Sequence, residues 1–118
     1  MVELSSEVVE AAAYFAPENH HVLKDPRLRL FIEDARTFIR RTGRKYDLII
    51  SEPSNPWMSG VGDLFSIEHF RACLAALRED GVMAQWVHTY EMDDDTFKMI
   101  VKTYCSVCLL YTSDAADE

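Results

Sequence analysis

Short runs of apolar residues alternate along this chain with segments in which apolar residues recur every three or four positions. Continuous apolar runs bounded by turn residues predict buried strands, and the three-and-four spacing predicts amphipathic helices. The predicted strands cover residues 2–4, 28–32, 46–51 and 81–87. The predicted helices cover residues 5–16, 35–41 and 66–77, and a last segment that opens at residue 93 or 94 and includes residue 104.

The order of these elements predicts the fold. Strands that are apolar along their whole length are typical of a parallel sheet buried on both faces, and parallel strands are joined by helical crossovers. Each crossover should be right-handed. The sequence therefore predicts an α/β, Rossmann-like parallel sheet with helices on both faces. Its strands 28–32, 46–51 and 81–87 are expected to be parallel neighbours in one sheet.

The helical spacing also predicts caps and inward faces. Ser5 or Ser6 is expected to cap the first helix and Pro17 to end it, while Gly43 closes the second and Ser66 caps the third. Cys73 is expected beside the inner face of the third helix as a small hydrophobe. The predicted inward residues are Phe38 and Ile39, then Ile67, Phe70, Leu74 and Leu77, and finally Phe97, Ile100, Val101 and Tyr104.

The segment that follows the third strand carries the densest signals for a site. Its two prolines lack the N–H that a sheet ladder needs, so the strand must stop by Glu52. Its two glycines permit backbone angles that other residues avoid, so the loop can bend sharply. A solvated glutamate on a rigid proline turn is the alternative interpretation. From Ile49 to Phe65 the chain reads Ile-Ile-Ser-Glu-Pro-Ser-Asn-Pro-Trp-Met-Ser-Gly-Val-Gly-Asp-Leu-Phe.

The composition indicates a globular domain and argues against some kinds of partner. A chain of 118 residues with 48% hydrophobic residues suits a single globular domain. Its formal net charge of −8 argues against a nucleic-acid partner, which requires a basic face. Three cysteines, with no signal peptide and no apolar run of membrane-spanning length, predict a reducing, cytoplasmic location. The adjacent His20 and His21 lack a third ligand nearby in the sequence, so no metal site is expected.

Polar side chains follow each predicted strand. Glu3 ends the first strand, Asp34 follows the second, Glu52 follows the third, and Gln85 and His88 lie near the end of the fourth. In a parallel sheet these ends lie on one edge, where ligands bind, and a carboxylate there can hold ribose hydroxyls. For single residues other roles stay open: a helix cap for Asp34, a buried hydrogen-bonded amide for Gln85, and a structural histidine for His88.

The order of these motifs resembles the spermidine synthases, which are polyamine aminopropyltransferases on the class I methyltransferase-type Rossmann-like fold. The resemblance spans residues 2–107, and the segment around Glu52 is its most specific part. The matching motifs are Val-Glu-Leu-Ser, Glu-Asp-Ala, Tyr-Asp-Leu-Ile-Ile-Ser-Glu-Pro-Ser-Asn-Pro, Leu-Phe and Gly-Val-Met-Ala-Gln-Trp.

The resemblance implies a role for each matching residue. The acid at Glu3 holds the nucleoside ribose, and the acid at Asp34, beside Ala35, reads the adenine amino group. The acid at Glu52 binds the diamine and helps remove its proton. The other residues implied at the amine are Asn55, Gln85 and Trp57, the last as part of a lid. The implied reaction transfers an aminopropyl group from decarboxylated S-adenosylmethionine to an amine such as putrescine, without a metal.

Two departures from the family pattern bear on the substrate. Glu52 stands where the family usually has the shorter Asp, and Asn55 stands where it usually has a second Asp. Asn55-Pro56-Trp57 is also similar to the Asn-Pro-Pro-aromatic motif of methyltransferases that act on amino groups. The alternatives are therefore an S-adenosylmethionine-dependent N-methyltransferase and a non-catalytic nucleoside-binding module.

The resemblance also predicts where this chain lies in a longer protein. The family's glycine-rich cofactor loop would precede Val2, so residues 1–108 are expected to be a partial domain, incomplete at both ends and inactive alone. Residues 109–118, with three acids and no base, are expected to be a non-native tail. For the intact parent, a homo-oligomer is one expectation. Some family members are attached to membrane-spanning regions, and the same attachment in the parent is the alternative to a purely cytoplasmic location.

Overall fold

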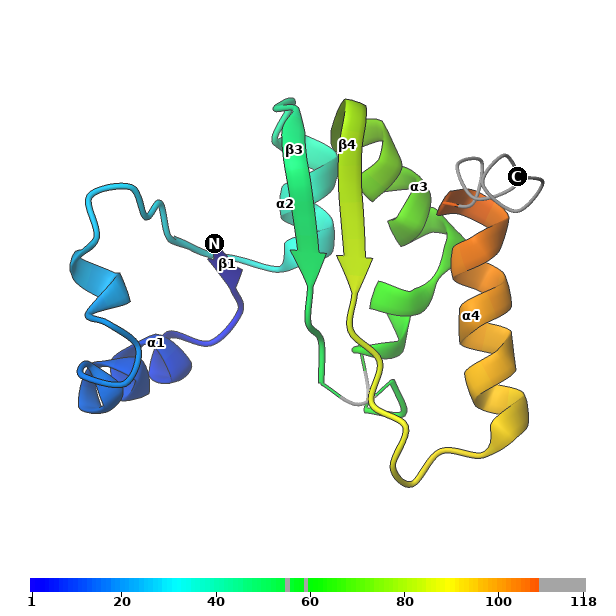
Figure 1. The fold of residues 1–118 in the computed structure, drawn as a ribbon, viewed down its shortest axis with the longest axis horizontal. Helices are drawn as coiled ribbons and strands as arrows, with labels where there is room; N and C mark the ends of the chain where they lie inside the picture. Colours follow the sequence, from blue (N-terminus) through cyan, green and yellow to red (C-terminus); the bar gives the residue numbers. More distant parts are fainter. Residues whose placement is uncertain (55, 59, 109–118) are drawn as a thin grey trace, which may run out of the picture. The chain divides into compact units, whose positions relative to one another are not determined.

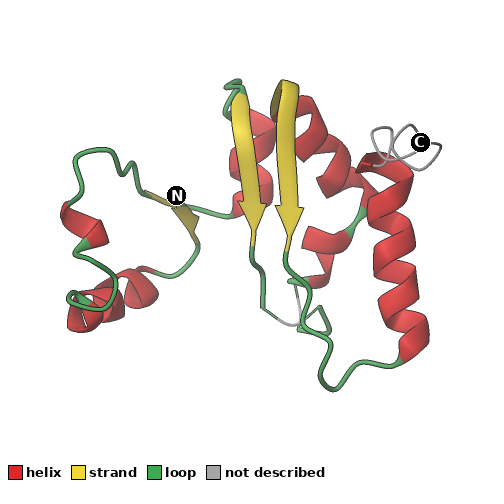
Figure 2. Cartoon of the chain, viewed as in Figure 1, coloured by secondary structure: helices red, strands yellow, loops and turns green. Residues whose placement is uncertain are grey.

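The computed structural model describes residues 1–54, 56–58 and 60–108, which form two compact units, Met1–Thr42 and a second unit that begins at Gly43. Both units combine helices with parallel strands, so the predicted α/β class is confirmed (Figures 1 and 2). Among the described residues, no helix combines the length and the apolarity needed to cross a membrane.

The first unit is built on a two-residue parallel ladder. Strand β1, Val2–Glu3, pairs with β2, Phe31–Ile32, in the register Val2 to Phe31 and Glu3 to Ile32. The predicted strand 28–32 was therefore too long, because its partner offers only two residues to the ladder. The helical elements of this unit are α1, Ser6–Ala12; two 3₁₀ turns, Ala13–Phe15 and Val22–Lys24; and α2, Ala35–Arg41.

Local capping explains where these helices begin and end. The Ser5 hydroxyl accepts a hydrogen bond from the backbone N–H of Val8 at 3.3 Å, as predicted. The α-helix ends at Ala12 rather than at residue 16, because the Asn19 amide donates to the Ala12 carbonyl at 2.7 Å and the chain tightens into a 3₁₀ turn. Gly43 follows α2 with a φ of +60°, so its predicted role as the closing residue is confirmed.

The second unit pairs two longer strands. Strand β3, Tyr46–Ser51, lies parallel to β4, Leu77–Gln85. Between them run the 3₁₀ turn Gly62–Phe65 and helix α3, Ile67–Ala76, and after β4 comes α4, Asp94–Cys108. The parallel pairing of the third and fourth predicted strands is confirmed. The prediction of one sheet was wrong for the second strand, because β2 pairs with β1 in a separate sheet.

Strand β4 begins and ends earlier than the sequence pattern indicated. Its register jumps from the pair Tyr46–Leu77 to the pair Leu48–Val82, so several extra residues bulge from β4. Gly81 lies in this bulge, and a Cβ there would come within 2.9 Å of the Tyr46 carbonyl oxygen. The predicted start at Gly81 thus marked the bulge and not the start of the strand.

The buried core of the described residues lies in the second unit. Phe70 is fully buried, and its ring meets the Tyr104 ring edge-on with 5.2 Å between centroids. The Tyr104 hydroxyl donates to the Met83 carbonyl at 2.7 Å, which ties α4 to β4. The core side chains are Phe65, Phe70, Cys73, Ala76, Leu77, Met83, Ile100 and Val107.

The predicted inward faces were only partly right. Phe70, Ile100 and the small hydrophobe Cys73 are buried as expected. Leu77 is buried too, but as the first residue of β4 rather than as part of α3. Helix α3 turns His69, Phe70, Cys73 and Ala76 inward, so its buried face is rotated from the predicted one. The side chains wrongly predicted to be buried, which are more than a third exposed, are Ile67, Leu74, Phe97 and Val101.

Candidate functional site

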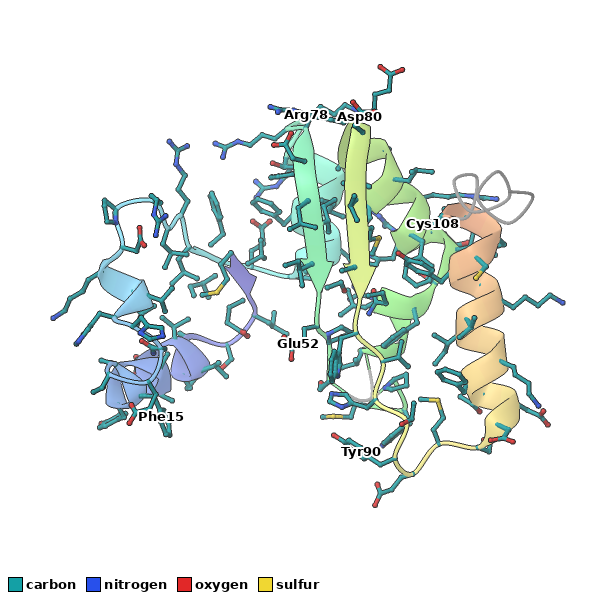
Figure 3. The ribbon with its side chains drawn as sticks, viewed as in Figure 1. Phe15, Glu52, Arg78, Asp80, Tyr90 and Cys108 are labelled. Carbon is teal, nitrogen blue, oxygen red and sulfur yellow. The ribbon has the colours of Figure 1, made fainter. Side chains whose placement is uncertain are left out.

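The carboxyl ends of β3 and β4 lie side by side. Ser51 and Gln85 are the last partners in the ladder, and the backbone N–H of Trp86 still donates to the Ser51 carbonyl at 2.8 Å. Glu52 and Trp86 therefore leave the sheet on neighbouring chains, a few ångströms apart in backbone terms. Figure 3 shows Glu52 at this end, whereas Arg78 and Asp80 lie at the opposite end of the sheet. The strand-end placement of Glu52 predicted by the sequence is present in the structure.

The loop that starts at Glu52 is anchored on both sides of its exposed part. Glu52 is exposed, but Pro53 directly after it is buried. Gly60 has a φ of +83°, and a Cβ at Gly62 would meet the Pro56 carbonyl oxygen at 3.0 Å. Both glycines are thus required by the backbone path, one by its left-handed angle and the other by a close approach.

The far end of this loop is held by α3. Phe65 is buried in the core, and the Ser66 hydroxyl caps the helix by accepting from the backbone N–H of His69 at 3.2 Å. Trp57, in the middle of the loop, is about half exposed. Asn55 lies outside the described residues. The loop therefore holds an exposed carboxylate directly before one buried anchor, Pro53, and an exposed indole between that anchor and Phe65.

Gln85 has one satisfied and one unsatisfied side of its amide. Its Nε2 donates to the backbone carbonyl of Trp86 at 3.0 Å. Its Oε1 is buried and accepts no hydrogen bond from the described residues. A buried acceptor without a hydrogen bond lowers the stability of the fold by about 1–3 kcal/mol. A ligand that donates a hydrogen bond to this oxygen would remove that cost. The sequence expectation of a fully hydrogen-bonded amide holds for the nitrogen and not for the oxygen.

Three aromatic side chains form a row after β4. Trp86, His88 and Tyr90 alternate along the chain, and ring centroids are 6.0 Å apart for the first pair and 5.0 Å apart for the second. The Trp86 indole N–H donates to His88 Nδ1 at 3.4 Å, a long hydrogen bond. Trp86 and Tyr90 are 55% and 60% exposed. The apolar pattern predicted Trp86 inside a strand and gave no role to Tyr90, although the i, i+2, i+4 spacing of Trp86, His88 and Tyr90 is visible in the sequence.

The candidate nucleoside residues lie in the first unit. Glu3 is half-buried, and its Oε1 accepts from the backbone N–H of Ser5 at 3.0 Å. Asp34 caps α2, because its Oδ1 accepts from the backbone N–H of Thr37 at 2.8 Å. Ala35 is the first residue of that helix. The helix-cap role that the sequence left open for Asp34 is therefore real, and a ligand would have to share this carboxylate with the cap.

The charge on Asp34 is stabilised in the folded chain. Burial by itself raises the pKa of this carboxyl, but the hydrogen bonds from Thr37 and the nearby Arg36 guanidinium outweigh it and hold the pKa below its ordinary value. Arg36 Nε lies 3.3 Å from Asp34 Oδ2. Asp34 is thus an anion at neutral pH, as an acceptor for an amino group must be.

Cysteine and histidine clusters elsewhere in the described part of the chain have a structural character. Cys73 Sγ lies 3.4 Å from His69 Nε2 inside the core, and burial raises the pKa of the Cys73 thiol to about 11. Such a thiol is a poor nucleophile at neutral pH. Across the described ranges, no three histidine, cysteine or acidic side chains are grouped so that they could hold a metal ion.

Comparison with known proteins identifies the relatives of the chain. The family model described as the spermine/spermidine synthase domain matches residues 1–115. A polyamine aminopropyltransferase of Clostridium perfringens strain 13 is 41% identical over 83 residues, which are 70% of this chain and 29% of that protein. Proteins of the same name from Alkaliphilus oremlandii and Pyrobaculum islandicum are 30% and 33% identical, over 94% and 70% of this chain and 40% and 30% of their own lengths.

The matches cover most of this chain but less than half of each relative. The chain spans between about three tenths and two fifths of the length of the curated relatives that it matches. The family model nevertheless covers nearly all of the chain, including the strand ends and the loop after Glu52. The chain therefore belongs to the spermine/spermidine synthase domain family.

Proposed function

We propose that the protein containing this chain transfers an aminopropyl group from decarboxylated S-adenosylmethionine to an amine. The observation that carries the proposal is the exposed carboxylate of Glu52 at the carboxyl end of β3, on a proline-glycine loop anchored at both ends. The family match places this loop in a domain named for spermine and spermidine synthesis. The relatives named above are called polyamine aminopropyltransferases, which supports the same reaction here.

The reaction requires that the amine nitrogen and the aminopropyl carbon be aligned, and that one group accept a proton. The lone pair of the amine nitrogen attacks the aminopropyl carbon attached to the sulfonium, and the carbon–sulfur bond breaks with its electrons going to sulfur. The sulfonium becomes a neutral thioether, and the new secondary ammonium or its precursor loses a proton. Glu52 takes that proton or holds the amine in line, and positioned groups of this kind accelerate reactions by about two to four decades.

The remaining residues divide between the two reactants. Gln85, with its buried unsatisfied Oε1 beside the end of β3, accepts a hydrogen bond from the amine. Asn55 and Trp57 lie on the Glu52 loop, as an orienting amide and as part of the lid. Glu3 and Asp34, with Ala35 at the start of α2, hold the nucleoside of the donor. No metal is needed for any of these roles.

A second candidate is an S-adenosylmethionine-dependent N-methyltransferase. It is favoured by Asn55 in place of a second carboxylate and by the aromatic Trp57 two residues later. Both enzymes need the same nucleoside site and differ in the group on sulfur. Donor choice therefore separates them, and a protein that binds nucleoside but transfers neither group would be the non-catalytic module.

Single-turnover assays of the intact parent protein with each donor and a panel of amines test the proposal. We expect aminopropyl transfer, and we expect Glu52→Gln to lower its rate by about two to four decades while donor binding is kept. Glu68→Gln, an exposed acid at the start of α3, is the matched control and should turn over like the parent. Normal turnover by Glu52→Gln would remove the catalytic role, and transfer only of a methyl group would select the second candidate.

A further inference from the structure

The aromatic row after β4, formed by Trp86, His88 and Tyr90, has no role in the reaction as outlined. Two of its members expose more than half of their surface, although each is large and amphipathic. Exposed aromatic groups gathered in one place often mark a binding surface. The row begins at the residue whose N–H bonds to Ser51, so it begins directly beside Glu52. In Figure 3, Tyr90 lies at the same end of the second unit as Glu52.

The rings are held in a fixed order. Trp86 and His88 meet nearly edge-on, with 77° between ring planes, and His88 and Tyr90 are tilted by 55°. The indole N–H reaches His88 Nδ1, which requires that nitrogen to act as acceptor. This hydrogen bond occupies the polar edge of the indole, and more than half of the Trp86 surface stays exposed. The row therefore offers aromatic faces in a preset arrangement, which lowers the entropy cost of binding a ligand there.

The chemistry around the row selects a cation. Aromatic faces attract ammonium groups, and weakly hydrated, alkylated ammonium groups are the typical ligands of aromatic cages. The segment after the row carries Glu91, Asp94 and Asp95, all exposed, which adds a negative potential. Between Ser51 and Gly62 the loop carries Glu52 as its one acidic residue, and position 55 holds the uncharged Asn55. A carboxylate suits a primary ammonium, whereas a π face tolerates methyl groups on nitrogen.

We infer that the Trp86–His88–Tyr90 row is the subsite for the distal end of the amine acceptor, and that it favours an acceptor whose distal nitrogen is alkylated. This inference rests on the proposed function and names its substrate class more narrowly. The reacting primary amine lies at Glu52, and the alkyl chain leads along the segment that follows β4, toward the aromatic rings. Trp86 and Tyr90 are specificity-determining residues in this arrangement and take no part in the proton transfer.

The test uses the intact parent protein and two acceptors. These are 1,4-diaminobutane and its N,N-dimethyl derivative, which keeps one primary amine and carries a tertiary ammonium at the other end. Trp86→Leu and Tyr90→Leu keep apolar bulk and remove a π face, while Trp86→Phe keeps a face. Tyr14→Leu, at a tyrosine that is 87% exposed in the first unit, is the matched control.

We expect the KM for the dimethyl acceptor to rise roughly three- to thirty-fold in each leucine variant, with kcat unchanged. The preference for the dimethyl acceptor over 1,4-diaminobutane should fall by a similar factor, and Trp86→Phe should keep most of it. A merely structural role would lower the melting temperature and leave this preference intact. Because Tyr90 lies in a loop outside the core, its variant gives a result even if the Trp86 variants fold poorly.

The failure of this inference is distinguishable from the failure of the proposed function. If the parent transfers to both amines and the leucine variants keep its preference and KM, the row is not the subsite and the transferase assignment stands. If no amine is used, the transferase assignment fails, and calorimetric titration of the dimethyl acceptor still tests the row. Equal affinities of parent and leucine variants, or no binding by the parent, would overturn it.

Discussion

Removal of the Phe70 side chain is the sharpest test of how this fold is held together. Phe70 of α3 is fully buried, and its ring packs edge-on against Tyr104 of α4. Truncation of a buried phenylalanine to alanine typically costs 3–5 kcal/mol, from lost burial and the cavity that remains. The aromatic pair adds about 0.5–1.5 kcal/mol beyond its area. For Phe70→Ala we therefore expect a loss of about 4–5 kcal/mol, in the upper half of that range.

That loss is large against the total stability of a domain, which is about 5–15 kcal/mol. Urea unfolding of the intact parent protein, followed by circular dichroism, should show a lower midpoint with an unchanged slope. Phe70→Leu should fall between the parent and the alanine variant, because it fills part of the cavity. Phe15→Ala, at a phenylalanine that is 61% exposed, is the control and should change stability by less than about 0.5 kcal/mol. A cost below 1 kcal/mol for Phe70→Ala would refute the assignment of the core.

Three further predictions concern the β4 bulge at Gly81, the helix-capping carboxylate of Asp34 and the buried thiol of Cys73. Gly81→Ala should lower the melting temperature more than Gly43→Ala. The Cβ at Gly81 would meet the backbone oxygens of Tyr46 and Arg78 at 2.9 and 3.0 Å, whereas at Gly43 the Cβ meets open space and only the left-handed backbone angle is strained; equal shifts would contradict this. The lowered pKa of Asp34 means that its contribution to stability is full above its unfolded pKa of about 4 and is lost as pH falls through its folded pKa. Asp34→Asn should accordingly flatten the acid limb of a stability-against-pH curve, and an unchanged limb would show that the carboxylate is not stabilised in the fold. The Cys73 thiol, with a pKa of about 11, should react with maleimide more slowly than the half-buried Cys105 and Cys108 when peptides are mapped by mass spectrometry, and earlier labelling of Cys73 would show that it is accessible.

Local rules account for what the sequence predicted well. Serine and glycine caps at Ser5, Ser66 and Gly43 depend on neighbouring backbone groups, and each lies where it was expected. The end of β3 at Ser51 followed from the prolines after it, so the position of Glu52 at the end of a strand was also predictable. The α/β class followed from the alternation of apolar runs with helical spacing.

Features that depend on distant contacts were not predictable in the same way. The rotation of α3 places Cys73 inward and Leu74 outward, because the helix packs against α4 and β4 through Phe70 and Tyr104. The bulge at Gly81 depends on the register of β4 against β3, which single-strand periodicity does not contain. The partition of strands into two sheets depends on pairing partners as well.

In the candidate site, too, features set by local sequence were predictable and features set by distant contacts were not. Chain order alone placed Glu52 at the end of a strand and suggested an acid cap at Asp34. The exposed aromatic row was missed, because Trp86 was read as the continuation of an apolar strand while the ladder itself ends at Gln85. The buried, unsatisfied oxygen of Gln85 is visible only once the surrounding atoms are placed. The assigned roles of the candidate site residues all stay predictions, for Glu3, Asp34, Ala35, Glu52, Asn55, Trp57 and Gln85.

The position of the buried side chains has a consequence for how the chain resists opening. Every core side chain of the described residues belongs to the second unit, whereas Met1–Thr42 has none that is fully enclosed. Amide protons exchange through local openings whose free energy follows the buried apolar contacts around them. The amides of β3, β4 and α3 should therefore be the slowest to take up deuterium. The amides of β1 and β2 should exchange faster, because the local openings that expose them cost less free energy. The carboxylate at Glu52 thus lies at the end of the most protected sheet, whereas the carboxylates at Glu3 and Asp34 lie in the unit whose amides should exchange faster.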